Sequence, residues 1–356
     1  MKFWSLLLAG VLLSGCAHSQ SSTNPMPKHH LPDGTFRNNY LESIDKPFTD
    51  LIKWRWNSQT PEPLSFPLAD NDPEFLRQNR TEPTLTWVGH ATFLLQYRGV
   101  NILTDPHLTR RASPVSFAGP ERSTPPGISL EDLPEIDLVV ISHNHYDHLD
   151  RITVQKLYER QQSNPPRFFV PLKQKAWFDD LGIPNVVELD WYGQDSLGEW
   201  NIHAVPVQHW TSRSPWDRNQ VLWAGWVLEH PEFRFFFAGD SGYSQDFRDL
   251  GERFGSFDLA ALPIGAYNPR WFMKAAHMNP EEAVRIHQEI GAAYSVGMHW
   301  GTFQLTDEPM DEPPQLLREA LRQAGLPEDR FFVMQHGETR RLDFLESRPN
   351  TAQAGD

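Results

Sequence analysis

The ten residues ISHNHYDHLD, at positions 141–150, constrain the fold of this chain more than any other stretch. They carry three histidines and two aspartates, and they begin where the apolar run LVVI, residues 138–141, ends. Such a run is typical of a strand buried on both faces. Titratable groups crowded against a buried strand lose hydration free energy unless a bound ion or a charged partner compensates for it. The stretch therefore predicts a metal-binding loop at the carboxyl end of a buried strand.

The spacing within this loop suggests how its side chains are shared between metals. His143 and His145 are two residues apart, so in an extended loop both imidazoles point the same way and can hold one cation. Asp147 and His148, one turn further on, can face a second cation. Imidazole and carboxylate together are the donor set expected for Zn(II), with Fe(II) or Mn(II) as alternatives.

One loop cannot complete two metal sites, and the chain offers three more ligands directly after apolar runs. His209 follows the run at 203–207, Asp240 the run at 235–239, and His299 the run at 294–298. A carboxylate such as Asp240 can bridge two cations, because each of its oxygens can contact one. The sequence thus predicts a two-metal centre with seven ligands, which are His143, His145, Asp147, His148, His209, Asp240 and His299.

Short apolar runs alternate with helical patterns from about residue 84 onward, which indicates an α/β chain. Hairpin signals mixed with helices in both halves favour two sheets between helices over one parallel sheet. The segment 106–134 is rich in Pro and Ser and predicts a long loop. We expect helices at 150–162, 279–291 and 314–324, and strands at 85–88, 92–96, 101–104, 167–170, 186–189, 200–207, 221–228, 234–238, 259–263, 294–298 and 331–334.

The N-terminal stretch MKFWSLLLAGVLLSGC predicts an export signal over residues 1–15. Its end resembles the bacterial lipobox, which implies cleavage before Cys16 and lipidation of that thiol. Ala17 after Cys16 resembles lipoproteins of the outer membrane, so we expect a lipid-anchored protein of the cell envelope that faces the periplasm. Residues 16–45 read as a flexible tether, in which His29 and His30 bind metal loosely or are simply solvated. Residues 46–345 are expected to form one hydrolase domain, and 346–356 a disordered tail.

Charge and cysteine content argue against a nucleic-acid-binding protein and against a fold stabilised by disulfides. The net charge of -14 and the lack of a basic run argue against a nucleic-acid partner. Cys16 is the only cysteine, so no internal disulfide can form.

Several motifs together are similar to one known family. The stretches WVGHAT (87–92), ISHNHYDHLD, FFFAGDSGY (235–243), PIGAYNPRWFMK (263–274) and MHWGTF (298–303) resemble the metallo-β-lactamase fold superfamily and, within it, the N-acylphosphatidylethanolamine-hydrolysing phospholipase D family. The resemblance implies an αβ/βα four-layer sandwich. It also implies two Zn(II) ions per chain and, as in relatives that form dimers, a homodimer.

The resemblance also assigns the ligands. It places one zinc on His143, His145 and His209, and the other on Asp147, His148 and His299, with Asp240 between them. Two such cations lower the pKa of a shared water and supply a hydroxide nucleophile, which Asp147 is placed to orient.

Other residues are expected near the substrate. His277 matches a non-ligand active-site histidine of the family, which contacts the phosphate or protonates the leaving group, although it could instead only support the helix that follows. Arg270, Trp271 and Lys274 suit a pocket for a phosphate beside acyl chains, and Trp54 and Trp56 a membrane-facing rim. His90 and His336 are each either a hydrogen-bond partner of a ligand or a core histidine.

The leading hypothesis is a zinc-dependent phospholipase D that converts N-acylphosphatidylethanolamine or a related phospholipid to phosphatidic acid and an N-acylethanolamine. A lactonase or esterase of the same fold is the alternative enzyme, because the fold alone does not choose the electrophile. A non-catalytic envelope lipoprotein is the third hypothesis.

Overall fold

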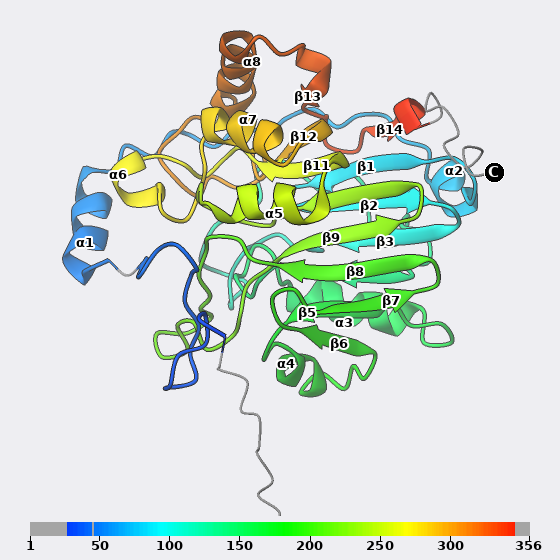
Figure 1. The fold of residues 1–356 in the computed structure, drawn as a ribbon. Coiled ribbons are helices and arrows are strands. Elements are labelled where there is room, and N and C mark those ends of the chain that lie inside the picture. The colour runs from blue at the N-terminus through cyan, green and yellow to red at the C-terminus, as the bar shows by residue number, and fades with distance from the viewer. Residues whose placement is uncertain (1–26, 45, 346–356) are drawn as a thin grey trace, which may run out of the picture.

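Two seven-stranded sheets face each other in the computed structural model, which describes residues 27–44 and 46–345 (Figure 1). The first sheet has the order β14-β1-β2-β3-β4-β5-β6, and the second the order β13-β12-β11-β10-β9-β8-β7. The first consists of β1 (Thr84–Gly89), β2 (Thr92–Tyr97), β3 (Val100–Thr104), β4 (Leu138–Val140), β5 (Arg167–Pro171), β6 (Val186–Leu189) and β14 (Thr339–Arg341). The second consists of β7 (Gln194–Leu197), β8 (Trp200–Val205), β9 (Gly225–His230), β10 (Phe233–Phe237), β11 (Phe257–Pro263), β12 (Ala292–Met298) and β13 (Phe331–Phe332).

Both sheets are mixed, and their parallel parts determine where the loops converge. Strands β3, β4, β5 and β6 run parallel, as do β10, β11, β12 and β13, while the remaining pairs are antiparallel. The carboxyl ends of parallel strands lie at one edge of a sheet, where open α/β folds commonly bind ligands. The segments that follow β3, β4, β10 and β12 therefore share one edge of the sandwich.

The continuous apolar runs follow from burial on both faces of each sheet. In β4, Leu138 and Val140 belong to the core between the two sheets, whereas Val139 belongs to the core under the helices of the first sheet. The same alternation occurs in β5, where Phe169 faces the partner sheet and Phe168 faces the helices. These strands do not show the alternation of apolar and polar residues that is typical of a half-exposed strand, because neither face meets water.

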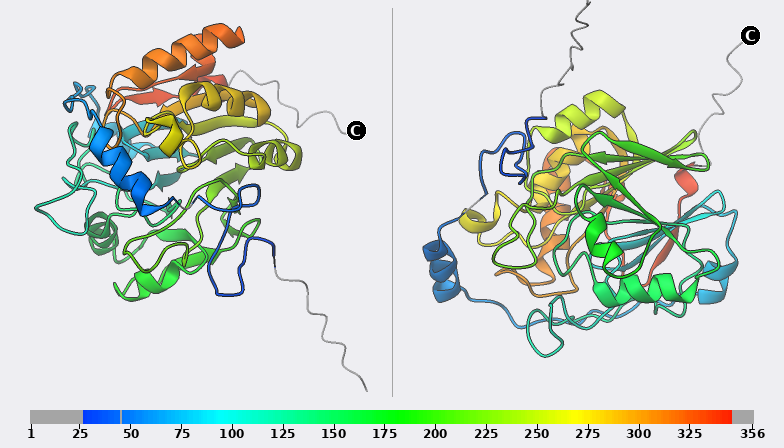
Figure 2. Two further views of the ribbon diagram at one scale, coloured as in Figure 1. Left: turned by 90° about the vertical axis from the view of Figure 1, so that its left-hand side faces the viewer. Right: turned by 90° about the horizontal axis from the view of Figure 1, so that it is seen from below.

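Helices cover the outer face of each sheet and complete the four layers predicted from the sequence (Figures 1 and 2). The first sheet is covered by α2 (Pro73–Gln78), α3 (Arg151–Arg160) and α4 (Lys175–Asp179). The second is covered by α5 (Asp246–Phe254) and α7 (Pro280–Glu289), with α8 (Glu312–Ala324) packed on α7. Two more helices, α1 (Phe48–Asn57) and α6 (Arg270–Met273), lie next to each other at the left of Figure 1. Short 3-10 turns, η1 (Glu328–Arg330) and η2 (Asp343–Leu345), occur near the C-terminal strands.

Local capping signals account for the starts of α3 and α7. The Asp150 side chain accepts a hydrogen bond from the Ile152 N–H at the start of α3. Asn279 and Glu282 form a reciprocal capping box at the start of α7, with Pro280 in its first turn. These caps lie where the sequence predicted them, next to the loops that carry His148 and His277.

The expected strand 221–228 is partly wrong, because β9 begins only at Gly225. The N–H groups of Leu222 and Ala224 donate to the carbonyls of Leu172 and Ser142 in loops of the first sheet, so this stretch links the two sheets instead of joining a ladder. Strands β7 and β14 were not expected, since both are short polar edge strands without an apolar pattern.

Residues 27–44, which we call the N-terminal arm, pack against the domain and correct the expectation of a free tether for this part of the chain. Phe36 is 2% exposed, and its N–H donates to the carbonyl of Asn219. Asn39 donates through its side chain to Asp246, and the Tyr40 hydroxyl donates to Asp249. Sequence-remote partners thus hold the arm in place.

The expected signal, Cys16 and the expected tail fall in 1–26 and 346–356, outside the described residues, and stay predictions. Among the helices of the described parts, none has the length and apolar character needed to cross a membrane.

Candidate metal centre

The seven ligands predicted from the sequence lie together at one edge of the sandwich, on loops that follow strands of both sheets. Five of the seven are buried, and His145 and Asp147 are half-buried, with the Asp147 side chain 15% exposed. Strand ends position them: His143 to His148 follow β4, Asp240 follows β10 and His299 follows β12. Folding of the two sheets therefore brings together groups that are far apart in sequence.

Three imidazoles form one half of the centre. The Nδ1 atom of His145 lies 2.9 Å from Nε2 of His143 and 3.3 Å from Nε2 of His209. The three nitrogens lie within 4.8 Å of one another, close enough to bind a single cation.

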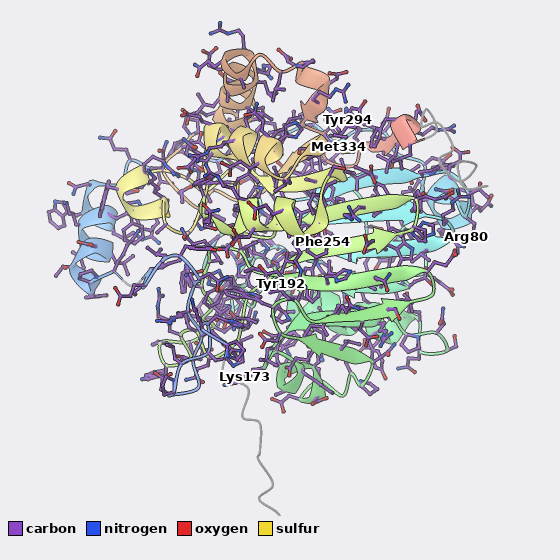
Figure 3. The ribbon with its side chains drawn as sticks, viewed as in Figure 1. Arg80, Lys173, Tyr192, Phe254, Tyr294 and Met334 are labelled. Atoms are coloured by element: carbon purple, nitrogen blue, oxygen red, sulfur yellow. The ribbon has the colours of Figure 1, made fainter. Side chains whose placement is uncertain are left out.

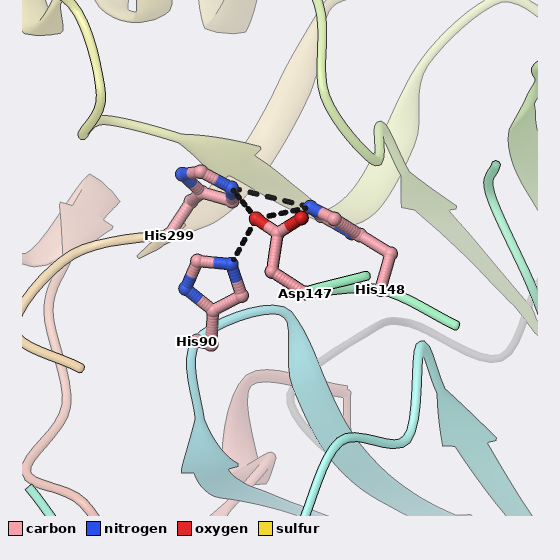
Figure 4. Close-up of side chains that lie close together, drawn as sticks. All are labelled: His90, Asp147, His148 and His299. Carbon is pink, nitrogen blue, oxygen red and sulfur yellow. Dashed lines mark hydrogen bonds and ion pairs between the residues drawn. The ribbon is translucent and has the colours of Figure 1, made fainter. Parts of the chain in front are cut away.

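The second half contains Asp147, His148 and His299 (Figure 4). Oδ2 of Asp147 lies 3.4 Å from Nε2 of His148 and 3.3 Å from Nε2 of His299. The two Nε2 atoms are 3.2 Å apart. This grouping matches the second ligand set that the family resemblance implies.

Asp240 lies between the two halves. Its Oδ2 is 3.8 Å from Nε2 of His209 and 3.2 Å from Nε2 of His148, and its Oδ1 is 3.1 Å from Nε2 of His299. A carboxylate placed this way can contact cations in both halves.

Outer hydrogen bonds fix which nitrogen of each imidazole faces the centre. Nδ1 of His209 lies 2.9 Å from the Ala276 carbonyl oxygen, which can only accept, so Nδ1 carries the proton. Nδ1 of His148 likewise donates to Asp105 at 2.7 Å. Nδ1 of His143 lies 2.8 Å from the hydroxyl of Ser142, which itself donates to Asp105. The Nε2 atoms of all three rings therefore point into the centre, as metal ligands require.

The electrostatics of the first half suit a cation. Burial lowers the pKa of His143 and His209 well below the ordinary value and that of His145 to about 4, so these imidazoles are neutral. Nε2 of His143 and Nε2 of His209 each direct a lone pair at Nδ1 of His145. That nitrogen carries at most one proton, so at least one lone pair has no hydrogen-bond donor. A divalent cation satisfies all three, and the residues present therefore fit a metal.

In the second half, carboxylates outweigh burial. Burial works to lower the pKa of His299, but Asp240 and Asp147 raise it to about 9. The same carboxylates hold the pKa of His148 well above its ordinary value against burial. Without a cation, His148 and His299 retain protons, and their positive charge balances the two carboxylates. A bound divalent cation would take over this role.

Asp105 is a functional residue that the sequence reasoning missed. It follows β3, is fully buried, and accepts hydrogen bonds from the Ser142 N–H at 2.6 Å and from His148. Because Ser142 also contacts His143, this one carboxylate orients ligands in both halves of the centre. Its position directly after an apolar strand was the available signal.

Replacing Asp105 by Asn is expected to weaken metal binding by about 10- to 100-fold, because His148 loses the acceptor that fixes its tautomer. Competition with a chelator of known affinity measures the change. Asp137→Asn is the matched control, since Asp137 accepts from the Asn101 N–H at the opposite end of β3. Equal metal affinity in the Asp105→Asn variant and the unaltered protein would contradict this role.

The N-terminal arm contributes to the centre through Asn38. The side-chain amide of Asn38 donates to the His209 carbonyl, and its oxygen accepts from the His209 N–H, both at 3.0 Å. Asn38 is 6% exposed, so both backbone groups of His209 are satisfied away from water. No local sequence signal links residue 38 to residue 209.

Of the two alternatives for His90, the structure favours a partner of a ligand. Its Nε2 lies 2.9 Å from Oδ2 of Asp147. Its N–H donates to Thr302 at 2.8 Å, and its carbonyl accepts from the His299 N–H at 3.0 Å. His336 lies one step further out, with Nε2 2.9 Å from the Thr302 hydroxyl.

Two residues of the centre, His90 and His299, have φ values of +55° and +64°. L-residues avoid this left-handed region, and such strain is concentrated at functional sites. The hydrogen bond between their backbones holds both in place.

His277 lies beside the first half of the centre, and one of its nitrogens is within 4.8 Å of ligand atoms of His209 and Asp240. Its Nδ1 is 3.8 Å from Oδ2 of Asp240, and its side chain is 15% exposed. Burial lowers its pKa to about 4, so it is neutral at neutral pH. Of the predicted site residues, His277 is therefore placed to meet a molecule that approaches the centre from solvent.

The three residues expected to bind substrate have different positions. Arg270 donates to the His277 carbonyl at 2.8 Å and pairs with Glu282 at 2.6 Å, so its guanidinium supports His277. Trp271 is 50% exposed, and Lys274 is also exposed. A cavity of about 20 Å³ reaches His299 and has room for a water molecule but not for an acyl chain.

Several known proteins are similar to this chain in sequence or in fold. The model of the beta-lactamase superfamily domain matches residues 100–300. N-acyl-phosphatidylethanolamine-hydrolyzing phospholipase D 1 of Caenorhabditis elegans is 44% identical over 267 residues, which cover 71% of this chain and 74% of that protein. The mitochondrial N-acyl-phosphatidylethanolamine-hydrolyzing phospholipase D of Saccharomyces cerevisiae is 36% identical over 265 residues, covering 72% of this chain and 56% of that protein. Among solved structures, isothiocyanate hydrolase from Delia radicum gut bacteria matches 72% of this chain and 98% of its own with a TM-score of 0.57 at 23% identity.

Proposed function

Because this chain belongs to the beta-lactamase superfamily and is a metal-dependent hydrolase related to N-acyl-phosphatidylethanolamine-hydrolyzing phospholipases D, we propose that it is itself a phospholipase D with two Zn(II) ions per chain. Its substrate is N-acylphosphatidylethanolamine or a related phospholipid, and its products are phosphatidic acid and an N-acylethanolamine. The observation that carries the proposal is the complete set of seven ligands with His277 beside Asp240.

Bound divalent cations would lower the pKa of a water that they share and would offset negative charge on the phosphoryl oxygens. The chain's own residues supply orientation. The contacts of Asp147 described above are all made by Oδ2, so Oδ1 is available to accept a hydrogen bond from the attacking water. His90 keeps this carboxylate from rotating.

His277 is suited to the leaving group. As a neutral imidazole it donates one hydrogen bond to the phosphate or to the departing alkoxide oxygen. Arg270 fixes the backbone of His277 and so determines where the ring lies.

A lactonase or esterase of the same fold is the second candidate, since the same ligands can serve attack on a carbonyl carbon. The two phospholipases D named above favour phosphorus as the electrophile, because their names state that they hydrolyse a phospholipid. The ligand set alone does not choose between the two electrophiles, and the test below therefore includes a lactone.

An exposed apolar surface supports the choice of a lipid substrate. On α1, Phe48, Ile52 and Trp56 are 73%, 50% and 87% exposed. Trp271 of α6 adds to this surface, and the Lys53 ammonium lies 5.0 Å from the centre of its ring. Aromatic and aliphatic side chains mixed with cations suit the interface of a membrane with anionic lipids.

The two tryptophans expected on a membrane-facing rim differ in the structure. Trp54 is 8% exposed, stacks on Phe272 at 4.9 Å and donates to Asp307 at 2.9 Å. It therefore anchors α1 on α6, and only Trp56 faces solvent. Lipidation of Cys16 and attachment to the outer membrane remain part of the proposal and would keep this face near its substrate.

Mass-spectrometric product analysis tests the proposed activity. The zinc-loaded protein is incubated separately with N-acylphosphatidylethanolamine, phosphatidylethanolamine and a simple lactone, beside an Asp147→Asn control. We expect phosphatidic acid from the unaltered protein only. Hydrolysis of the lactone with both phospholipids intact would replace the phospholipase proposal by the second candidate.

A triple variant, Phe48→Ser with Ile52→Ser and Trp56→Ser, is expected to bind phospholipid vesicles about 10- to 100-fold more weakly, because three exposed side chains can no longer enter the bilayer. Vesicle co-sedimentation measures the binding. Hydrolysis of a detergent-dispersed substrate should stay near the original rate. Leu316→Ser on α8, where Leu316 is 41% exposed, is the control for loss of exposed apolar area elsewhere.

A further inference from the structure

The N-terminal arm carries a second group of metal-type ligands outside the centre described above. His29 and His30 of the arm meet Asp190, which follows β6, and the three donor atoms lie within 4.8 Å of one another. None of these residues belongs to the catalytic ligand set.

Both imidazoles converge on one carboxylate. Nε2 of His29 lies 2.7 Å from Oδ1 of Asp190, and Nε2 of His30 lies 2.8 Å from Oδ2. Two imidazoles with one carboxylate are a donor set that zinc prefers. With metal–ligand bonds of about 2.0–2.2 Å in a tetrahedron, neighbouring ligand atoms lie about 3.3–3.6 Å apart, so a cation requires the donor atoms to separate by less than about 1 Å.

Aromatic packing fixes the two rings independently of the carboxylate. The His29 ring stacks on Trp191 at 4.4 Å with an interplanar angle of 29°. The His30 ring meets the face or edge of Phe36 at 5.1 Å and 83°. The imidazoles are therefore held in a binding orientation before any ion arrives, which lowers the entropic cost of binding.

The carboxylate is ionised and accessible. Burial works to raise the pKa of Asp190, but the hydrogen bond from His29 outweighs it and the pKa lies below the ordinary value. The side chains of Asp190 and His30 are 31% and 23% exposed, so water can complete the coordination from the open side.

Lys173, labelled in Figure 3, also contacts the arm: its ammonium donates to the Gly34 carbonyl and lies over the Phe36 ring.

We propose that His29, His30 and Asp190 bind a further divalent transition-metal cation, Zn(II) by the chemistry of the donors, which fastens the N-terminal arm to the end of β6. We assign the cation a structural role, because its ligands come from the arm and from the segment after β6 and so join the two. Its effect reaches the catalytic centre indirectly, since the same arm holds His209 through Asn38. This inference does not depend on the substrate of that centre.

Metal counting on the full chain tests the site. Protein equilibrated with Zn(II) alone and freed of excess is analysed by inductively coupled plasma mass spectrometry, beside a His29→Gln/His30→Gln variant. Glutamine keeps a hydrogen-bond donor for Asp190 and so keeps the arm docked. We expect one zinc fewer per chain in the variant. The control is His230→Gln, because His230 is also a buried histidine near a single carboxylate, Glu199, at 3.5 Å.

Equal zinc content in the double variant and the unaltered protein would overturn the proposal and leave only a hydrogen-bonded contact. If the double variant fails to fold, Asp190→Asn provides the same count with a change of charge alone. Limited tryptic cleavage at Arg37 is an independent readout: a chelator should accelerate it in the unaltered protein more than in the variant. The same acceleration in both would also overturn the site.

Discussion

Hydrolysis by an Asp240→Asn variant is expected to fall by about 10³- to 10⁴-fold, which corresponds to about 4–5 kcal/mol of transition-state stabilisation. Asp240 is the carboxylate that faces both halves of the centre, with Nε2 of His148 at 3.2 Å and Nε2 of His299 at 3.1 Å. Asparagine has nearly the same shape but cannot supply negative charge to two cations. We therefore expect the variant to lose metal as well as activity.

Metal content and initial rates on the same preparation measure this effect. Asp258→Asn is the matched control, because Asp258 is also a buried carboxylate of the second sheet, at the start of β11 and away from the ligands. Full metal content with normal hydrolysis in the Asp240→Asn variant would remove Asp240 from the centre. Addition of a strong chelator to the unaltered protein should reproduce the loss, and Zn(II) should restore activity.

A His277→Ala variant is expected to lose about 10²- to 10³-fold in kcat while keeping its metals, since the role proposed for His277 is contact with the reacting groups and not metal binding. Its Nδ1 is 3.8 Å from Asp240, and its side chain is more exposed than those of His143, His209 and His299. Rate measurements at saturating substrate together with metal analysis separate the two effects. His203→Ala on β8 is the control for removal of a half-buried histidine elsewhere.

The kcat and the metal content of the His277→Ala variant together identify the role of His277. Loss of metal would make it a ligand, whereas an unchanged kcat would reduce it to the supporting residue that was the alternative interpretation of its position before α7. A His277→Gln variant that recovers part of the rate would indicate hydrogen bonding to the phosphate, because glutamine can donate but cannot titrate.

The sequence predicted which side chains come together at this edge, because a strand end is a local signal. His143 and Asp240 each follow an apolar run, and parallel strands place such ends at the same edge of a sheet. The four-layer fold could be predicted for the same reason, since the mixed pattern of strands and helices leaves few arrangements that bury both sheets.

The partners of supporting residues were not predictable in this way. Asp105 also follows a strand, but its contacts with Ser142 and His148 form only when β3 and β4 pair. Asn38 has no pattern around it that indicates His209. Spacing along the chain shows which groups are neighbours in sequence, whereas these contacts depend on tertiary structure.

The sequence also does not show which of Trp54 and Trp56 is buried. They are two residues apart on one helix, so they lie on different sides of it. Which side faces Phe272 depends on where α6 lies, and the sequence of α1 does not contain that information.

The N-terminal arm also has a consequence for the order of events during folding. His29 meets a residue 161 positions later, Asn38 one 171 positions later and Tyr40 one 209 positions later. Closing loops of this length costs conformational entropy before any contact repays it, so such contacts form slowly. A ribosome must complete residue 209 before Asn38 can support the backbone of His209, and residue 249 before the arm has all these partners. We therefore expect the arm to dock late, and a chain that begins at residue 46 to assemble its sheets yet hold His209 loosely.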